Sequence, residues 1–232
     1  MKIKKIALRL IKAFPFLIIF ADFVKIILHP KSEIALWRDY FKTSKSAEFL
    51  RVPVSEGTVQ NAQKAALFVL ASDMIYEIKL IGMLALGLAM NGRKPVLLLA
   101  KRYIWAKRYL KAFGFNDFVY WEDAKLLPAE LDECRDAAKR FLSQELSFQS
   151  VKNWTFHGAL IGPQIISSIS RTLMQGATDL GDEKVKKLLA ELLPETLANV
   201  YMARHLMEKI SPELMTLIEA NYPLMGALVD TA

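Results

Sequence analysis

The sequence predicts an α/β fold: a Rossmann-like parallel sheet preceded by amphipathic helices at the N-terminus. Three observations support this. Two short apolar runs, at 65–71 and 95–100, have the length and continuity of strands buried on both faces. A helix-length segment follows each run, and a glycine closes each of these segments, Gly92 and Gly114. Strands that alternate with helices form right-handed parallel sheets, whose ligands bind beyond the carboxyl ends of the strands.

The elements of the first half of the sheet follow directly from Ala65. Ser72 and Asp73 have the chemistry of a helix N-cap, and Glu77, one turn further on, is expected to be a solvated helical residue. The predicted order is a strand at 65–71, a helix from this cap to Asn91-Gly92, a strand at 95–100, a helix at 103–113 and a strand at 117–120.

The second half is predicted to be mostly helical, with one more strand. Pro128 introduces a charged amphipathic helix, and Pro194 is expected to mark the start of a separate helix. The predicted order is a helix at 129–146, an irregular segment at 147–163, a helix at 165–174, a loop at 176–182, one or two helices at 183–209, a strand at 214–218 and a helix from Leu224 that still runs at Ala232.

The charge is concentrated at the N-terminus. The chain of 232 residues has a formal net charge of +7, and Met1–Arg51 holds 11 Lys and Arg against 4 Asp and Glu. The remaining residues hold 20 of each and are neutral overall. A nucleic-acid-binding body would itself be basic, so no nucleic-acid partner is predicted. The single cysteine, Cys134, excludes an internal disulfide, and its acidic neighbours predict an inert thiol in a reducing cytoplasm.

The first residues predict a basic amphipathic helix that lies on a membrane. Apolar residues fall at helical spacing on one face, and the other face is basic with no acid among its residues. The residues assigned to membrane contact are Lys2, Lys4, Lys5, Arg9, Lys12, Phe14 and Phe16. The next apolar run is too short to span a bilayer, which predicts peripheral binding to anionic lipids on the cytoplasmic side. A signal peptide and a helix that packs on the core are the alternatives.

These patterns divide the chain into three parts. Residues 1–51 form the membrane-associating segment, 52–64 a linker, and 65–232 the Rossmann-like domain. A second amphipathic helix with aromatic anchors is expected around Trp37–Phe41 and Phe49.

Several segments of the domain resemble a known family. They are Asp73–Leu80, Met90–Val96, Phe113–Asp117, Gly176–Leu180 and Glu219–Pro223. Together they are similar to the N-terminal, acceptor-side domain of bacterial GT-B glycosyltransferases of capsule and surface-polysaccharide clusters. The resemblance implies two Rossmann-like domains that face each other across a cleft. The acceptor binds the N-terminal domain, and the nucleotide-sugar donor binds the C-terminal one.

The sequence departs from that family because it ends in the helix after the fourth predicted strand. We therefore expect a truncated transferase, inactive alone, whose donor is held by a missing C-terminal domain or a separate partner, with no cofactor in this chain. The implied acceptor is a saccharide or a lipid-linked saccharide.

Candidate site residues come from the predicted strand ends and from the irregular segment. His157 and Glu219 are the candidate catalytic residues: a neutral imidazole can take a proton from an acceptor hydroxyl, and a carboxylate can orient one. The candidate acceptor-binding residues are Ser72, Asp73, Arg102, Trp154, Arg171, Asn221 and Tyr222. For each a structural role is the alternative: a helix cap for Ser72 or Asp73, N-capping by Asn221, and a hydrogen-bonded structural histidine for His157.

Other chemistries lack their motifs. The turn after the first strand has no Gly-x-Gly-x-x-Gly, which argues against a dinucleotide site, and the sequence has no phosphate-binding Gly-x-x-x-x-Gly-Lys loop, no Gly-x-Ser-x-Gly elbow and no metal-ligand spacing. Two further hypotheses remain open: a non-catalytic membrane-surface binding or scaffold protein, and a small α/β enzyme complete at 232 residues.

Overall fold

The computed structural model describes residues 28–50, 64–174, 176 and 178–232. The chain divides into two compact units, one ending at Arg51 and the other beginning at Val52. In the first unit, α3 (Pro30–Leu50) places the rings of Trp37, Tyr40 and Phe41 together, with centroids 5.5–5.9 Å apart. The residues predicted to contact the membrane, from Lys2 to Phe16, and most of the predicted linker lie outside the described residues.

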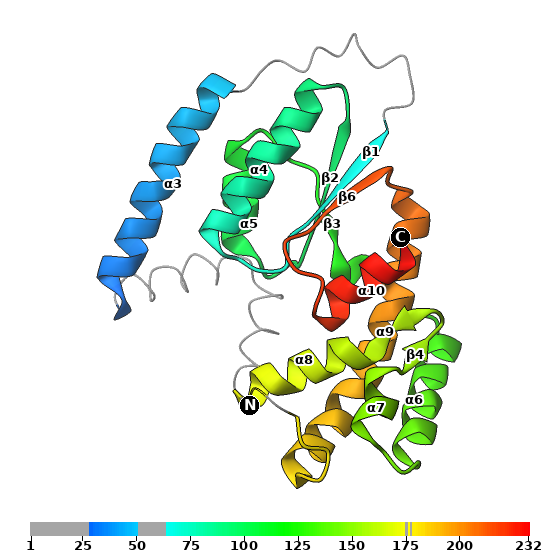
Figure 1. The fold of residues 1–232 in the computed structure, drawn as a ribbon. Helices are drawn as coiled ribbons and strands as arrows, with labels where there is room; N and C mark the ends of the chain where they lie inside the picture. Colours follow the sequence, from blue (N-terminus) through cyan, green and yellow to red (C-terminus); the bar gives the residue numbers. More distant parts are fainter. Residues whose placement is uncertain (1–27, 51–63, 175, 177) are drawn as a thin grey trace. The chain divides into compact units, whose positions relative to one another are not determined.

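The second unit contains a four-stranded, fully parallel sheet, which confirms the predicted fold class (Figure 1). Its strands are β1 (Ala65–Val69), β2 (Lys94–Leu99), β3 (Val119–Tyr120) and β6 (Leu214–Thr216), in the order β3-β2-β1-β6. β1 is central: Phe68 pairs with Leu97 on one side and with Thr216 on the other. The strand order reverses between β1 and β6, and ligands of open α/β sheets bind beside such a switch point.

Helices cover both faces of this sheet because alternate strand residues point to opposite sides. Leu67, Val69 and Leu98 are fully buried in the main core. Four helices complete this core: α6 (Pro128–Leu142), α8 (Ile161–Leu173), α9 (Glu183–Ile210) and α10 (Pro223–Thr231). Phe68, Leu97 and Leu99 are equally buried but belong to the opposite face, where α4 (Ile75–Met90) and α5 (Ile104–Ala112) pack. The glycines predicted to close these two helices, Gly92 and Gly114, have φ values of 76° and 99°.

The connection from β3 to β6 is a helical layer with a small hairpin. It comprises η2 (Trp121–Asp123), α6 (Pro128–Leu142), α7 (Phe148–Lys152), β4 (Thr155–Phe156), β5 (Ala159–Leu160), α8 (Ile161–Leu173) and α9 (Glu183–Ile210), and α10 (Pro223–Thr231) follows β6. The prediction of an irregular segment at 147–163 was wrong, because it holds α7, the β4–β5 hairpin and the start of α8.

Pro194 does not start a separate helix, because it lies inside α9, which is 28 residues long and continues on both sides of the proline. Proline removes one helical hydrogen bond, but Leu189, Leu193 and Leu197 are buried along this stretch and hold the helix in place.

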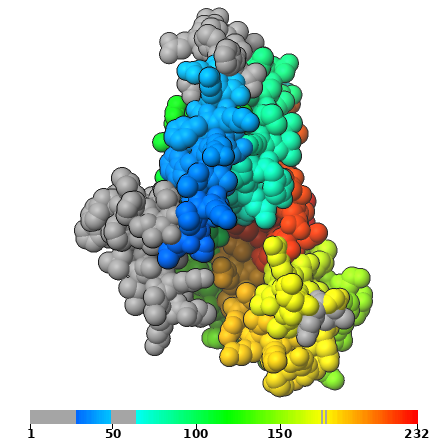
Figure 2. All heavy atoms as spheres, turned by 90° about the vertical axis from the view of Figure 1, so that its left-hand side faces the viewer, coloured from blue at the N-terminus to red at the C-terminus, as the bar shows by residue number. Residues whose placement is uncertain are grey.

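None of the helices among the described residues is long and apolar enough to cross a bilayer. α4, with 16 residues, most resembles such a helix in its composition, since apolar side chains lie on both its inner and its outer side. Figure 2 shows α4, in blue-green, at the surface of the molecule.

Candidate functional site

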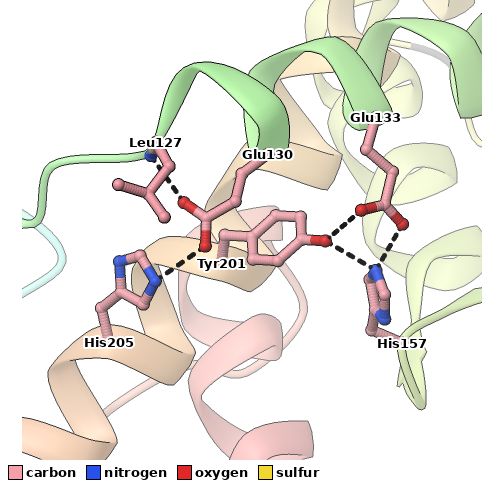
Figure 3. Close-up of polar contacts among 6 residues, drawn as sticks. All are labelled: Leu127, Glu130, Glu133, His157, Tyr201 and His205. Atoms are coloured by element: carbon pink, nitrogen blue, oxygen red, sulfur yellow. Dashed lines mark hydrogen bonds and ion pairs between the residues drawn. The ribbon is translucent and has the colours of Figure 1, made fainter.

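Three elements of the helical layer bring one histidine, one carboxylate and one phenol together (Figure 3). We call Glu133, His157 and Tyr201 the His157 cluster. His157 Nε2 lies 2.8 Å from Glu133 Oε1 and 2.9 Å from the Tyr201 hydroxyl, which donates to Glu133 Oε2 at 2.5 Å. Glu133 comes from α6, Tyr201 from α9, and His157 from the turn between β4 and β5. The structure therefore makes the predicted histidine part of a hydrogen-bonded network.

The turn that holds His157 follows from its sequence. His157 and Gly158 form the two-residue loop of the hairpin, with φ values of 49° and 85°. Two-residue hairpin loops favour positive φ at both positions, which glycine adopts freely and histidine more readily than most residues. The backbone therefore aims the imidazole at α6 and α9.

The hydrogen bonds of the cluster define the state of the imidazole. The Tyr201 proton points to Glu133 and an ionised carboxylate only accepts, so Nε2 of His157 carries the hydrogen. In the neutral ring Nδ1 is then an acceptor, and it has no hydrogen-bond partner among the described residues. The His157 side chain is 32% exposed, so part of the ring faces solvent. The cluster has the geometry of a base oriented by a carboxylate.

The charges of the cluster are fixed by the same bonds. Hydrogen bonds from Tyr201 and then from His157 hold the pKa of the Glu133 carboxyl below its usual value. Burial, together with the bond to Glu133, raises the pKa of Tyr201 to about 12, so the phenol keeps its proton at neutral pH. Glu133 is therefore the anion of the cluster.

A second histidine–carboxylate pair lies one helical turn away. His205 Nε2 is 2.9 Å from Glu130 Oε1, and Glu130 Oε2 accepts from the Leu127 backbone N–H at 2.7 Å at the start of α6. His205 also lines a cavity of about 170 Å³ with Asp123 and Ala124, at the carboxyl end of β3. The Tyr201 and His205 ring centroids are 6.5 Å apart, so the two pairs lie next to each other. Together they form a row of polar side chains between the end of β3 and the β4–β5 hairpin.

A groove with polar and aromatic walls adjoins the His157 cluster. We call it the Trp154 groove; it has a volume of about 550 Å³ and is lined by Ala137, Arg140, Phe141, Gln144, Ser150, Asn153, Trp154, Thr155 and Phe156. The rings of Phe141 and Trp154 stack with centroids 4.0 Å apart. Phe156 precedes His157 in the chain, and Ala137 lies one turn along α6 from Glu133. An aromatic platform with guanidinium and amide groups is a typical lining for a small polar ligand.

At the sheet edge, the predicted caps have other partners. Neither Ser72 nor Asp73 caps α4, whose N-cap is Met74 with no side-chain bond. Asp73 accepts from Trp105 N (3.2 Å) and Ala106 N (2.7 Å), so it caps α5 instead. The side chain of a residue at the end of β1 reaches α5 because parallel strand ends meet at one edge.

Ser72 forms a hydrogen bond to a carboxylate that was predicted to be solvated, that of Glu77. Glu77 is only 4% exposed, accepts from Ser72 Oγ at 2.5 Å and from Ala71 N at 3.2 Å, and thus closes the β1–α4 turn. The expectation of a solvated Glu77 was therefore wrong.

The remaining candidates are scattered. Arg171 lies over the Tyr222 ring at 5.0 Å, so these two predicted binding residues do meet. Arg102 lies 5.4 Å from its neighbour Tyr103. Glu219 is exposed, and no hydrogen bond, ion pair or ring contact among the described residues joins it to His157. Asn221 does not cap α10, because the N-cap is Tyr222 with no side-chain bond.

Glu133 and Tyr201 were not predicted to belong to the site, although the sequence contains a signal for both. Glu130 and Glu133 are three residues apart, and Tyr201 and His205 are four apart, so each pair shares one helix face. The contact between these faces joins residues 68 and 75 positions apart in the chain, which the spacing alone does not give.

Within the described ranges no group of three or more His, Cys, Asp or Glu side chains is arranged to hold a metal ion. Comparisons with protein families, with curated proteins and with solved structures found no match to this chain.

Proposed function

We propose that this chain is the acceptor-binding half of a membrane-associated glycosyltransferase that acts in surface-polysaccharide synthesis. The observation that carries the proposal is the oriented base: Glu133 and Tyr201 hydrogen-bond Nε2 of His157 and leave Nδ1 without a partner among the described residues, and Phe156, the residue before His157, lines the Trp154 groove. A parallel sheet with a Rossmann-like strand order is the scaffold that such a half requires. The nucleotide-sugar donor is assigned to a second Rossmann-like domain, on this polypeptide or on a partner.

In this proposal the Trp154 groove holds the saccharide acceptor. A sugar ring packs its C–H face on the aromatic platform of Trp154, while Asn153 and Arg140 bind its hydroxyls. The volume of about 550 Å³ lies within the range of small-molecule sites.

The chemical step would use His157 as a general base. Nδ1 accepts the proton of an acceptor hydroxyl, whose oxygen forms a bond to the anomeric carbon as the bond to the nucleoside diphosphate breaks. Glu133 stabilises the imidazolium that results, without taking its proton.

A binding experiment tests the acceptor site directly. The chain is titrated with mono- and oligosaccharides of surface polysaccharides, followed by calorimetry and by tryptophan fluorescence. We expect saturable binding that Trp154→Ala weakens about tenfold, the equivalent of about 1.4 kcal/mol. Phe148→Ala is the matched control, because Phe148 is 49% exposed on neighbouring α7 and does not line the groove. Equal losses in both variants, or no binding of any saccharide, would contradict the proposal and favour the non-catalytic scaffold.

The base is tested separately in membranes from cells that carry the native gene. His157→Asn suits the positive φ of the turn but removes the basic nitrogen. We expect saccharide binding to persist and incorporation of labelled sugar into lipid-linked saccharide to fall at least about a hundredfold.

A further inference from the structure

The outer side of α4 is an apolar stripe. Five of its side chains are more than 40% exposed and recur at helical spacing: Tyr76 66%, Leu80 44%, Met83 53%, Leu84 45% and Met90 62%. The inner side of the same helix is buried through Ile78, Ile81 and Ala85. A contiguous exposed apolar surface of this kind marks an interaction site.

Cationic α5 packs beside this stripe. Phe113 lies so close to Gly82 that a Cβ there would be 2.5 Å from its ring, and Lys79 Nζ lies 5.7 Å from the Tyr109 ring centroid. We call the outer sides of the two helices the α4–α5 face. Its α5 portion carries Lys111, which is exposed, and beside it Lys107 and Arg108, which are partly buried.

The charge of these two helices is one-sided. Residues 75–90 and 104–112 contain four Lys and Arg and a single acid, Glu77, which is buried, so together they have a net charge of +3. Residues 52–232 are neutral overall. The two helices are therefore basic within a neutral body.

We propose that the α4–α5 face docks on an anionic lipid bilayer, with the α4 stripe at the acyl boundary and the α5 cations at the headgroups. An exposed apolar helix face next to clustered cations is the combination that interfacial binding requires. Charge complementarity favours a lipid surface over a second copy of this chain, whose identical face would repel it. The inference deepens the membrane association in the proposed function by naming the surface that makes it, and its test needs neither a saccharide nor a donor domain.

A fluorescent label at one position locates the contact in the full chain. The native Cys134 is 1% exposed, and burial raises its pKa to about 11, so it stays unlabelled at neutral pH. Leu84→Cys carries an environment-sensitive dye on the stripe, and Glu191→Cys carries it on the exposed side of α9. With vesicles of phosphatidylcholine and phosphatidylglycerol, we expect a blue shift and brightening at position 84 and no change at position 191.

A charge variant tests the electrostatic part. Lys111→Gln should weaken vesicle binding about fivefold, as expected for a cation near an anionic surface, whereas Lys187→Gln on α9 should not. A chain that sediments with vesicles while the label at position 84 does not respond would overturn the proposal. So would a dye response without vesicles that grows with protein concentration, since it would show a second copy on the face. Failure of saccharide binding leaves this result unaffected.

Discussion

The substitution Gly162→Ala should destabilise the protein by forcing α7 and α8 apart. Gly162 is the second residue of α8, and a Cβ at this position would lie 2.0 Å from Val151 O and 2.3 Å from Lys152 O. These are backbone atoms at the end of α7, so no side-chain rotation relieves the overlap. Val151 O also accepts from Trp154 N at 3.2 Å, and Gly162 N donates to Trp154 O at 3.2 Å. Gly162 therefore allows the close approach of α7 and α8 that holds the segment with Trp154 in place.

The size of the effect follows from the distances. Ordinary contact begins at 3.4 Å, so the Val151 carbonyl would have to move by 1.4 Å. Overpacking of this kind costs about 1–3 kcal/mol, and alanine returns up to about 1 kcal/mol of helix propensity. Because the overlapping atoms belong to the backbone, the cost lies at the upper end of this range. We expect a net loss of about 2 kcal/mol in the free energy of unfolding, or roughly 4–8 °C in melting temperature for a chain of this size.

Urea unfolding followed by circular dichroism measures this loss. Gly87→Ala is the matched control, since Gly87 lies within α4 and a Cβ there meets nothing within 4 Å. The control should be stabilised by about 0.5–1 kcal/mol, because alanine has less conformational entropy to lose than glycine. An unchanged midpoint for Gly162→Ala, or equal shifts of the same sign in both variants, would refute the packing argument.

Three further predictions concern the polar contacts. Tyr201→Phe removes the largest cause of the lowered Glu133 pKa, so that pKa should rise in a carboxyl NMR titration, with a loss of about 1 kcal/mol in stability. The Tyr201 pKa is about 12 in the folded protein against 10.0 ordinarily, so its contribution is complete below pH 10 and lost as pH rises toward 12; the wild type should lose more stability than Tyr201→Phe across that interval in urea titrations. Asp73→Ala should cost about 1 kcal/mol by uncapping α5, whereas Asp117→Ala, an exposed site, should cost less than about 0.5 kcal/mol in the same assay.

The sheet could be predicted because its signals are local. Each central strand is a continuous apolar run, each following helix ends at a glycine with positive φ, and the parallel order follows from the alternation. Even the short fourth strand, β6, was predicted, since Leu214 opens an apolar run between two breaks. The hairpin was missed because its strands have two residues each and show no alternation long enough to detect.

The site was predicted only in part because its contacts are remote in the chain. His157 and Trp154 were identified by residue type, but the partners of His157 lie 24 and 44 residues away. Asp73 shows the same limit. Its side chain was predicted to cap the next helix, α4, but it caps α5 instead, through Trp105 N, 32 residues further along the chain. The residue type predicts which interactions a side chain can make, whereas the tertiary fold determines its partner.

The positions of the Glu77 and Asp73 carboxylates also argue against a phosphate-binding site at this edge of the sheet. In dinucleotide-binding sheets the N-terminus of the helix after the first strand is left free for the pyrophosphate. Here Glu77 places a buried carboxylate in the first turn of α4, and Asp73 places another on the backbone N–H groups of α5. Each helix end at this edge thus already has an anion from the chain itself, which would repel a second one. This supports assigning the nucleotide donor to another domain, and it leaves the Trp154 groove, with its guanidinium and amide groups, as the better site for a neutral saccharide.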